Sequence, residues 1–227
     1  MRICLLGATG ASGKAILNYA QTKLQHENNN PHQITAIVRS PEKLENYKNT
    51  ENIKIIKGDV FSSENLSQIF NNHDVVISAL GFRGRNEEFP NSMKAITQAM
   101  KNNQIKDIII VGSQYHSLES QQKESNWLLK FFINYIIKKV LDDHHRMYQF
   151  LETLPADENE ASPINWHYAC FPGLGGIEST EKELRVEKGV DIIMDRGSGR
   201  VSRGDVARYV FSQIGQVERG QVSVCYK

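Results

Sequence analysis

The sequence has few cysteines, and they are not arranged in pairs. Cys4, Cys170 and Cys225 are far apart, and none belongs to a C-x-x-C motif. An odd, scattered set indicates buried, reduced thiols. It argues against a disulfide framework and against a zinc site built from cysteines.

An excess of charge of either sign is also absent. There are 27 lysines and arginines against 26 aspartates and glutamates, which gives a formal net charge of +1. Proteins that bind nucleic acid or a membrane surface commonly show a marked basic excess. We therefore expect no nucleic acid and no membrane among the partners.

Long hydrophobic runs are missing as well. The first run, from Ile3 to Leu6, stops at Gly7, which is too early for a secretory signal. No run approaches the roughly 18 apolar residues of a membrane-spanning helix. We expect a cytoplasmic protein whose residues 1–227 form one domain, with a small substrate-side portion toward the C-terminus.

What the sequence does contain is a regular alternation of strand-like and helical patterns. Two runs, VVIS and IIIV, are apolar on both faces, as strands inside a parallel sheet are. The alternation predicts an α/β fold, a doubly wound, Rossmann-like parallel sheet with helices on both sides. The expected strands are 2–6, 34–38, 53–57, 75–79, 107–111 and 165–171, and the expected helices are 12–24, 41–47, 64–70 and 90–103.

The stretch GATGASG joins the first expected strand to the first helix. Spaced glycines in that position are typical of a dinucleotide-binding loop. Gly7 allows a sharp turn, Gly10 leaves room for a pyrophosphate beside the backbone, and Gly13 lets the helix pack close to the sheet. The N–H groups that open the helix then face the phosphates, and Thr9 and Ser12 add hydroxyl donors.

The residue that ends the second strand indicates which dinucleotide is bound. NAD-preferring folds have an acidic residue there, which binds the ribose 2′-hydroxyl. This chain has Arg39 and no carboxylate before Glu42. A guanidinium suits a 2′-phosphate, with Ser40 and Lys43 close enough in sequence to assist. The predicted cofactor is NADP.

Further motifs identify a family resemblance. They are LLGATGASG, AIVRSPEKL, KGDV, VVISALGFRG, IIIVGSQ, LDDHHRM and VSRGDVARYV. In this order and spacing they resemble the atypical short-chain dehydrogenase/reductases of the NmrA-like, NAD(P)H-binding group, and most of all the biliverdin reductase B and flavin reductase type. The resemblance covers nearly the whole chain. It implies cofactor contacts at Gly7, Thr9, Gly10, Ala11, Ser12, Gly13, Arg39, Asp59, Val60, Leu80, Gly81, Arg83, Ser113 and Pro172.

The same resemblance implies direct hydride transfer from NADPH to a bound conjugated small molecule, such as a flavin, a quinone or a linear tetrapyrrole, in a monomer or homodimer. The cofactor carries that chemistry, and the protein orients two rings. Gly173, in FPGLGG, stands where the mammalian members have a histidine. This departure favours flavin reduction over tetrapyrrole reduction. The alternative is an NmrA-type regulator, which senses the dinucleotide and binds a partner without catalysis.

The predicted catalytic residues are Ser113 and Tyr115 in VGSQYHS. They follow the fifth strand, at the carboxyl edge where ligands of such sheets bind. Each can donate a hydrogen bond to the nicotinamide amide or to the substrate. Tyr135 and Lys139 form a Y-x-x-x-K motif, but Ser113 lies farther from Tyr135 than in the Tyr-dependent branch of these reductases. We interpret WLLKFFINYIIKKVL as an amphipathic helix, and Tyr-Lys catalysis stays the alternative.

No metal site is predicted. Asp142, Asp143, His144 and His145 are adjacent, and adjacent helical residues point about 100° apart, so they do not converge on one ion. We interpret them as a charge cluster at a helix N-terminus or as a buried structural pair.

The last third of the chain carries two further predictions. In VSRGDVA, Ser202 is the predicted N-cap of the last helix, Asp205 its acidic third residue, and Arg203 a salt-bridge partner. The charged stretch EKELRVEKG is interpreted as a solvated face.

Overall fold

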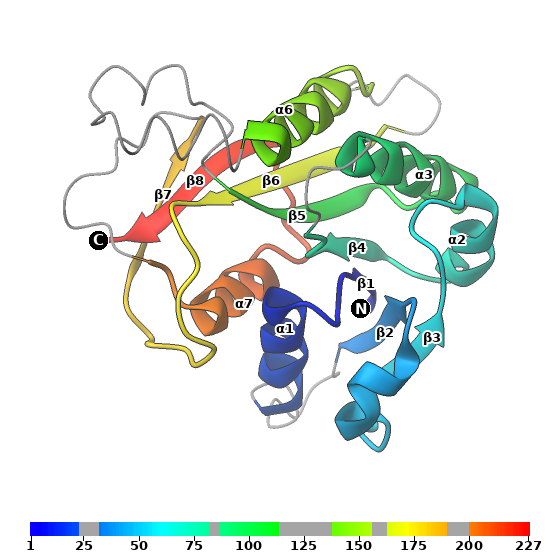
Figure 1. Ribbon diagram of the computed structural model, residues 1–227, viewed down its shortest axis with the longest axis horizontal. Coiled ribbons are helices and arrows are strands. Elements are labelled where there is room, and N and C mark those ends of the chain that lie inside the picture. Colours follow the sequence, from blue (N-terminus) through cyan, green and yellow to red (C-terminus); the bar gives the residue numbers. More distant parts are fainter. Residues whose placement is uncertain (23–31, 82–86, 114–137, 156–162, 190–199) are drawn as a thin grey trace.

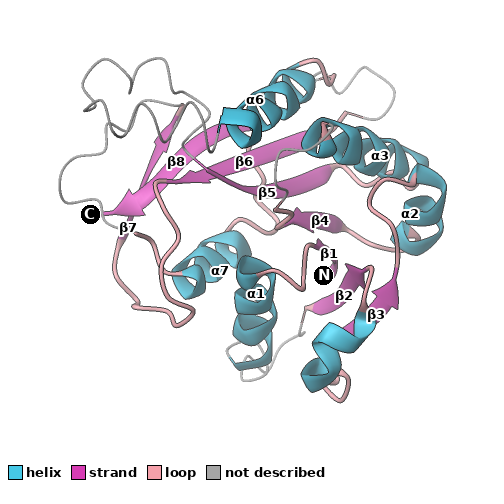
Figure 2. Cartoon of the chain, in the orientation of Figure 1, coloured by secondary structure: helices cyan, strands magenta, loops and turns pink. Residues whose placement is uncertain are grey.

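The computed structural model describes residues 1–22, 32–81, 87–113, 138–155, 163–189 and 200–227. Its strands form one sheet of eight, in the order β3-β2-β1-β4-β5-β6-β8-β7 (Figures 1 and 2). Among the described strand pairs only β7 and β8 run antiparallel. The strands are β1 (Arg2–Leu6), β2 (Gln33–Val38), β3 (Ile53–Lys57), β4 (Val75–Ser78), β5 (Asp107–Ser113), β6 (Asn165–Phe171), β7 (Leu184–Lys188) and β8 (Gly220–Tyr226).

Helices cover both faces of this sheet (Figure 1). Helices α1 and α7 pack together on one face, and α2, α3 and α6 lie on the other. The described helices are α1 (Ala11–Thr22), the 3₁₀ helix η2 (Pro41–Tyr47), α2 (Ser63–Phe70), α3 (Glu88–Asn102), α6 (Lys138–Glu152) and α7 (Arg203–Ser212). The predicted single-domain, doubly wound α/β fold is confirmed.

Side chains of the central strands alternate between two hydrophobic cores. Ile3 and Leu5 of β1 face the core under α1 and α7, whereas Cys4 and Leu6 face the core under α2, α3 and α6. All four are 0% exposed. This burial on both faces explains why the strand sequences are apolar throughout instead of alternating.

The predicted N-cap at Ser202 and the predicted buried thiols are confirmed. Ser202 accepts a hydrogen bond from the Asp205 N–H at the start of α7, and Ser62 accepts one from the Asn65 N–H at the start of α2. The three cysteines are free and buried.

The prediction for EKELRVEKG was incomplete, because this stretch forms strand β7 at the edge of the sheet. It pairs with β8, with Leu184 opposite Tyr226 and Lys188 opposite Val222. Neither β7 nor β8 was among the expected strands. The charged side chains of β7 are largely exposed, and charge on an edge strand discourages pairing with other chains. The charged composition of this stretch thus follows from its position at the edge of the sheet, and it does not show the pattern by which a strand is recognised in a sequence.

No helix in the described part of the chain combines the length and the apolar character needed to cross a membrane.

The sheet has a switch point at β1. This strand pairs with β2 on one side and with β4 on the other. In open α/β sheets, ligands bind in the crevice outside the carboxyl ends of the strands at such a point. The glycine-rich stretch leaves β1 at that crevice.

Candidate functional site

The glycine loop turns tightly between β1 and α1. Gly7 has a φ of +78°, and a Cβ placed on it would lie 2.4 Å from the Ala79 carbonyl oxygen. A Cβ on Gly13 would lie 2.3 Å from the Gly7 carbonyl oxygen. Both glycines are therefore required by close backbone approach, as the sequence predicts.

Gly10 occupies a different environment in the same loop. Its N–H donates to the Gly7 carbonyl oxygen at 3.0 Å, and a Cβ on it would meet only that oxygen, at 3.2 Å. Gly10 and Ala11 are exposed. The first N–H groups of α1 have no acceptor within the helix and open toward this exposed side, where an anion is favoured.

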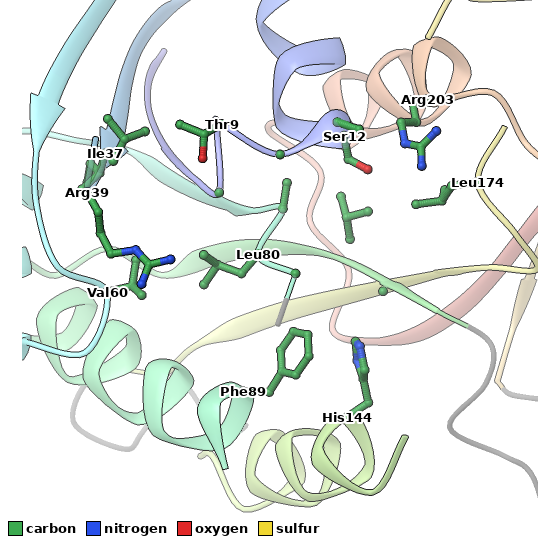
Figure 3. A pocket seen from close by; sticks show the side chains of 18 of the residues that line it. Thr9, Ser12, Ile37, Arg39, Val60, Leu80, Phe89, His144, Leu174 and Arg203 are labelled. Atoms are coloured by element: carbon green, nitrogen blue, oxygen red, sulfur yellow. The ribbon is translucent and has the colours of Figure 1, made fainter. Parts of the chain in front are cut away.

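A cavity of about 390 Å³ lies at the carboxyl edge of the sheet. Figure 3 shows Arg39 and Val60 at one side of it, Leu174 and Arg203 at the other, and Phe89 and His144 entering from helices α3 and α6. Nine of the residues predicted to contact the cofactor line this cavity together: Gly7, Thr9, Gly10, Ala11, Ser12, Arg39, Val60, Leu80 and Gly81.

Three other predicted contacts are placed differently. Gly13 is a packing position. The Asp59 carboxylate accepts from the Phe61 N–H at 3.0 Å, inside its own turn. Pro172 follows β6, outside the set of residues that line the cavity.

The predicted catalytic residues fall at the limit of the described chain. Ser113 is the last residue of β5, paired with Phe171 on β6, and its neighbour Gly112 lines the cavity. Arg83, Tyr115 and Tyr135 lie outside the described residues. Lys139 is exposed on α6.

The charge of the cavity suits a polyanion. Arg39 and Arg203 lie in its described lining together with His144, and no described lining residue is acidic. Within the described ranges, no carboxylate forms an ion pair with Arg39. An anionic ligand would thus meet cations without first displacing a carboxylate.

His144 is a cavity residue for which the sequence alone predicts no function. Its Nδ1 lies 2.9 Å from the Tyr168 hydroxyl oxygen, and its ring centroid lies 3.9 Å from that of Phe89. Gly112 makes this arrangement possible, because a Cβ on it would lie 2.1 Å from Tyr168 Cε2. A glycine inside the strand pattern IIIVGS was the available signal, since it marks a close approach.

Asp143, the neighbour of His144, joins helix α6 to the start of α3. It is 2% exposed, and its Oδ2 accepts from the Phe89 N–H at 3.0 Å. Burial raises the pKa of this carboxyl. Asp143 and His144 are both buried, as the interpretation of a buried pair expects, whereas the alternative of a charge cluster at a helix N-terminus is wrong, because both residues lie inside α6.

The predicted salt-bridge role of Arg203 is wrong. Asp205 forms its ion pair with Arg208, at 3.4 Å, one helical turn along α7. Arg203 is the first residue of that helix and lines the cavity instead.

Over the described ranges, no group of three His, Cys, Asp or Glu side chains is arranged to hold a metal ion.

Residues 7–216 match the sequence profile of a family described as NAD(P)H-binding. The chain belongs to this NAD(P)H-binding family. The profile spans both the glycine loop and the segment that carries Arg203. No curated protein sequence matches the chain.

Solved structures share the fold of this family member at low sequence identity. A protein from Bacteroides thetaiotaomicron that is described as an epimerase has a TM-score of 0.76 at 22% identity, over 99% of this chain and 96% of that one. A protein from Streptococcus pneumoniae that is described as an NADH-flavin reductase has a TM-score of 0.71 at 20% identity, over 100% of both chains. The anaerobilin reductase ChuY from Escherichia coli O157:H7 has 0.69 at 16%, over 99% and 96%. These similarities show the fold alone.

A nicotinamide dinucleotide fits the residues that are present. Neighbouring backbone leaves no room for a side chain at Gly7 and Gly13, whereas the loop is open at Gly10, where a pyrophosphate would approach. Arg39 stands at the end of β2, where the ribose of the adenosine half is bound in such folds.

Proposed function

We propose that this protein is an NADPH-dependent reductase that delivers a hydride to a flavin or another conjugated small molecule, in the manner of the biliverdin reductase B and flavin reductase type. One observation carries the proposal. The cavity that begins at Arg39 and passes the glycine loop continues to a second end, formed by Phe89, His144 and Leu174. That second end offers space beside the place where the nicotinamide would lie.

The proposed preference for NADPH over NADH rests on Arg39. Its guanidinium has a planar, permanently charged donor set that matches a phosphate, and its exposed position leaves it accessible to one. The loop residues Thr9, Gly10 and Ser12 would hold the pyrophosphate. Asp59, Arg83 and Pro172 remain proposed contacts on the strength of the family resemblance.

The substrate end is suited to a flat, conjugated ring. Phe89 and Leu174 supply apolar surface, and the buried bond to Tyr168 fixes the plane of the His144 ring. Ser113 and Tyr115 are proposed to donate hydrogen bonds to the nicotinamide amide or to the substrate. When bound, the cofactor supplies the hydride, and the chain's own residues orient the acceptor and shield it from water.

The test begins with cofactor binding and continues with acceptors. Calorimetry should show NADPH bound more tightly than NADH. With NADPH saturating, absorbance at 340 nm should fall on addition of at least one acceptor from a panel of flavins, quinones and a linear tetrapyrrole. If NADPH binds and no member of the panel is reduced, the reductase proposal fails and the NmrA-type regulator takes its place.

A further inference from the structure

The start of helix α7 brings a cation to the second end of the cavity. The Arg203 N–H donates to the Gly176 carbonyl oxygen at 2.7 Å, and its Nη1 donates to the Gly175 carbonyl oxygen. Leu174, in the same segment, forms a bridge to Val201. The chain that leaves β6 therefore holds Arg203 at the cavity wall, on the side away from Arg39 (Figure 3).

The acid nearest in sequence does not neutralise Arg203. Asp205 is 0% exposed, and its two oxygens are occupied by other donors. Those donors are the hydroxyls of Ser179, Thr180, Ser202 and Tyr226, the N–H groups of Thr180 and Glu181, and the Arg208 guanidinium. The Asp205 carboxylate therefore serves to anchor residues 179–181 to the start of α7 by hydrogen bonds.

Arg203 has no acidic partner elsewhere in the described chain. None of the described ion pairs includes it, and its buried Nε has no hydrogen-bond acceptor there. The Arg203 guanidinium is half-buried, and its side-chain hydrogen bond goes to a carbonyl oxygen. It has therefore lost part of its hydration without gaining a negatively charged partner. An anion at this point would supply one, through short charge-assisted hydrogen bonds.

The position of Arg203 in the fold distinguishes this anion from the phosphates of the cofactor. Arg39 directly follows β2, and the segment that carries Leu174 leaves β6, on the opposite side of β1 in the sheet order. A dinucleotide that spans the switch point places its adenosine half toward β2 and its nicotinamide half toward β4 to β6. The 2′-phosphate would then belong to Arg39 and the pyrophosphate to the glycine loop.

We infer that Arg203 is the anion subsite for the substrate, so that the preferred acceptor is a conjugated ring carrying a carboxylate or phosphate group. This inference rests on the proposed function and names the chemical class of its substrate. Arginine suits the role because its donor fork fits either anion with two parallel hydrogen bonds.

The experiment compares acceptors that share a ring and differ in charge. Riboflavin is the neutral probe, FMN the phosphate probe and 10-carboxymethylflavin the carboxylate probe, and 1,4-naphthoquinone with and without a 2-carboxylate gives a second pair. Binding to the protein saturated with NADP⁺ is measured by calorimetry, so that the readout does not depend on turnover. The variants are Arg203→Gln and Arg203→Lys, and the control is Arg200→Gln, which removes an exposed positive charge from the preceding segment.

In at least one pair the wild-type protein should bind the anionic probe about tenfold more tightly than the neutral one, with a preference that weakens as salt is added. Arg203→Gln should remove the preference, Arg203→Lys should keep part of it, and Arg200→Gln should leave it unchanged. The phosphate and carboxylate flavins then show which anion is preferred. The dissociation constant for NADPH should stay within about twofold in all variants.

Three results would overturn the inference. The first is the absence of an anion preference in every pair, and the second is a preference that survives in Arg203→Gln. The third is a loss of NADPH affinity in Arg203→Gln, which would assign Arg203 to the pyrophosphate. Failure of the wild-type protein to bind NADPH is a separate result, which would remove the proposed function and this inference with it.

Discussion

His144 on α6 and Tyr168 on β6 share a hydrogen bond of 2.9 Å between Nδ1 and the hydroxyl oxygen. Tyr168 is 0% exposed, and a buried hydroxyl requires a partner. The ring of His144 is held on one side by this bond and on the other by contact with Phe89. A titratable side chain is thereby fixed at the substrate end of the cavity before any ligand arrives.

Replacement of His144 tests whether this fixed ring acts on the acceptor. We expect His144→Gln to lower kcat/KM for the acceptor at least about tenfold, or about 1.4 kcal/mol of transition-state stabilisation. The NADPH dissociation constant should change less than about twofold, because the histidine lies away from the glycine loop and Arg39. The matched control is His145→Gln, since His145 is the exposed neighbour on the same helix. Equal kcat/KM in the two variants would show that His144 is structural only.

Replacement of Arg39 tests the choice of cofactor. The loss of a charge-assisted contact to a phosphate costs about 1.5–3 kcal/mol, or roughly tenfold to a hundredfold in affinity. Arg39→Ala should therefore weaken NADPH binding by that factor and change NADH binding little. Calorimetry with both dinucleotides measures the ratio, and Lys54→Ala serves as the control for a removed surface charge, because Lys54 is exposed on β3 and lies outside the described lining of the cavity. An equal loss for NADPH and NADH would exclude Arg39 as the residue that binds the 2′-phosphate.

The sequence predicts the part of the site that depends on local order. The glycine loop follows from a strand, three glycines and a helix within one short stretch, and the placement of Arg39 needs only the end of the second strand. The parallel sheet adds one inference, that carboxyl ends of successive strands share an edge. These features require no knowledge of which helix face meets which strand.

The rest of the site depends on packing between distant segments. His144 lies on an amphipathic helix. Only the packing of α6 against β6 shows that His144 faces the cavity while His145 faces solvent. The sequence predicts a salt bridge for Arg203 because that is the local expectation in a charged stretch, whereas hydroxyl groups from three separate segments occupy the nearby Asp205 carboxylate. Strand β7 was missed for a related reason: its charged composition is set by the edge position, which follows from its pairing with β8.

Two glycine substitutions separate binding from folding. Gly10→Ala places a methyl group 3.2 Å from the Gly7 carbonyl oxygen, on the exposed side of the loop, where the pyrophosphate would approach. Gly13→Ala places one 2.3 Å from the same oxygen, inside the packing of α1 against the loop. We expect Gly10→Ala to weaken NADPH binding at least about tenfold with little change in Tm. Gly10→Val should abolish binding.

Gly13→Ala should instead lower Tm, because overpacking of this kind typically costs about 1–3 kcal/mol. Thermal unfolding and NADPH calorimetry on the same preparations give both quantities. Tight NADPH binding by a folded Gly10→Val protein would refute the role assigned to that glycine.

Asp205 gives a prediction for the dependence of stability on pH. Burial alone would raise its pKa, but hydrogen bonds from Ser179, Thr180, Tyr226 and Ser202 outweigh that effect and hold the pKa well below its ordinary value of 3.8. A carboxyl group with a depressed pKa in the folded state contributes stability that is fully present above its unfolded pKa. That contribution is lost as the pH falls toward the folded pKa.

Asp205→Asn should therefore lower the free energy of unfolding at pH 7 by at least about 2 kcal/mol, since several charge-assisted hydrogen bonds are weakened together. For a chain of this size that corresponds to a fall in Tm of roughly 4–8 °C. The gap between wild type and variant should narrow as the pH falls from about 5 to about 2, because the wild-type carboxylate loses its advantage over that window. Denaturant unfolding at a series of pH values measures the gap, and Asp142→Asn, at an exposed aspartate on α6, controls for the change in net charge. A gap that stays constant across the window would mean that the charge of Asp205 does not stabilise the start of α7.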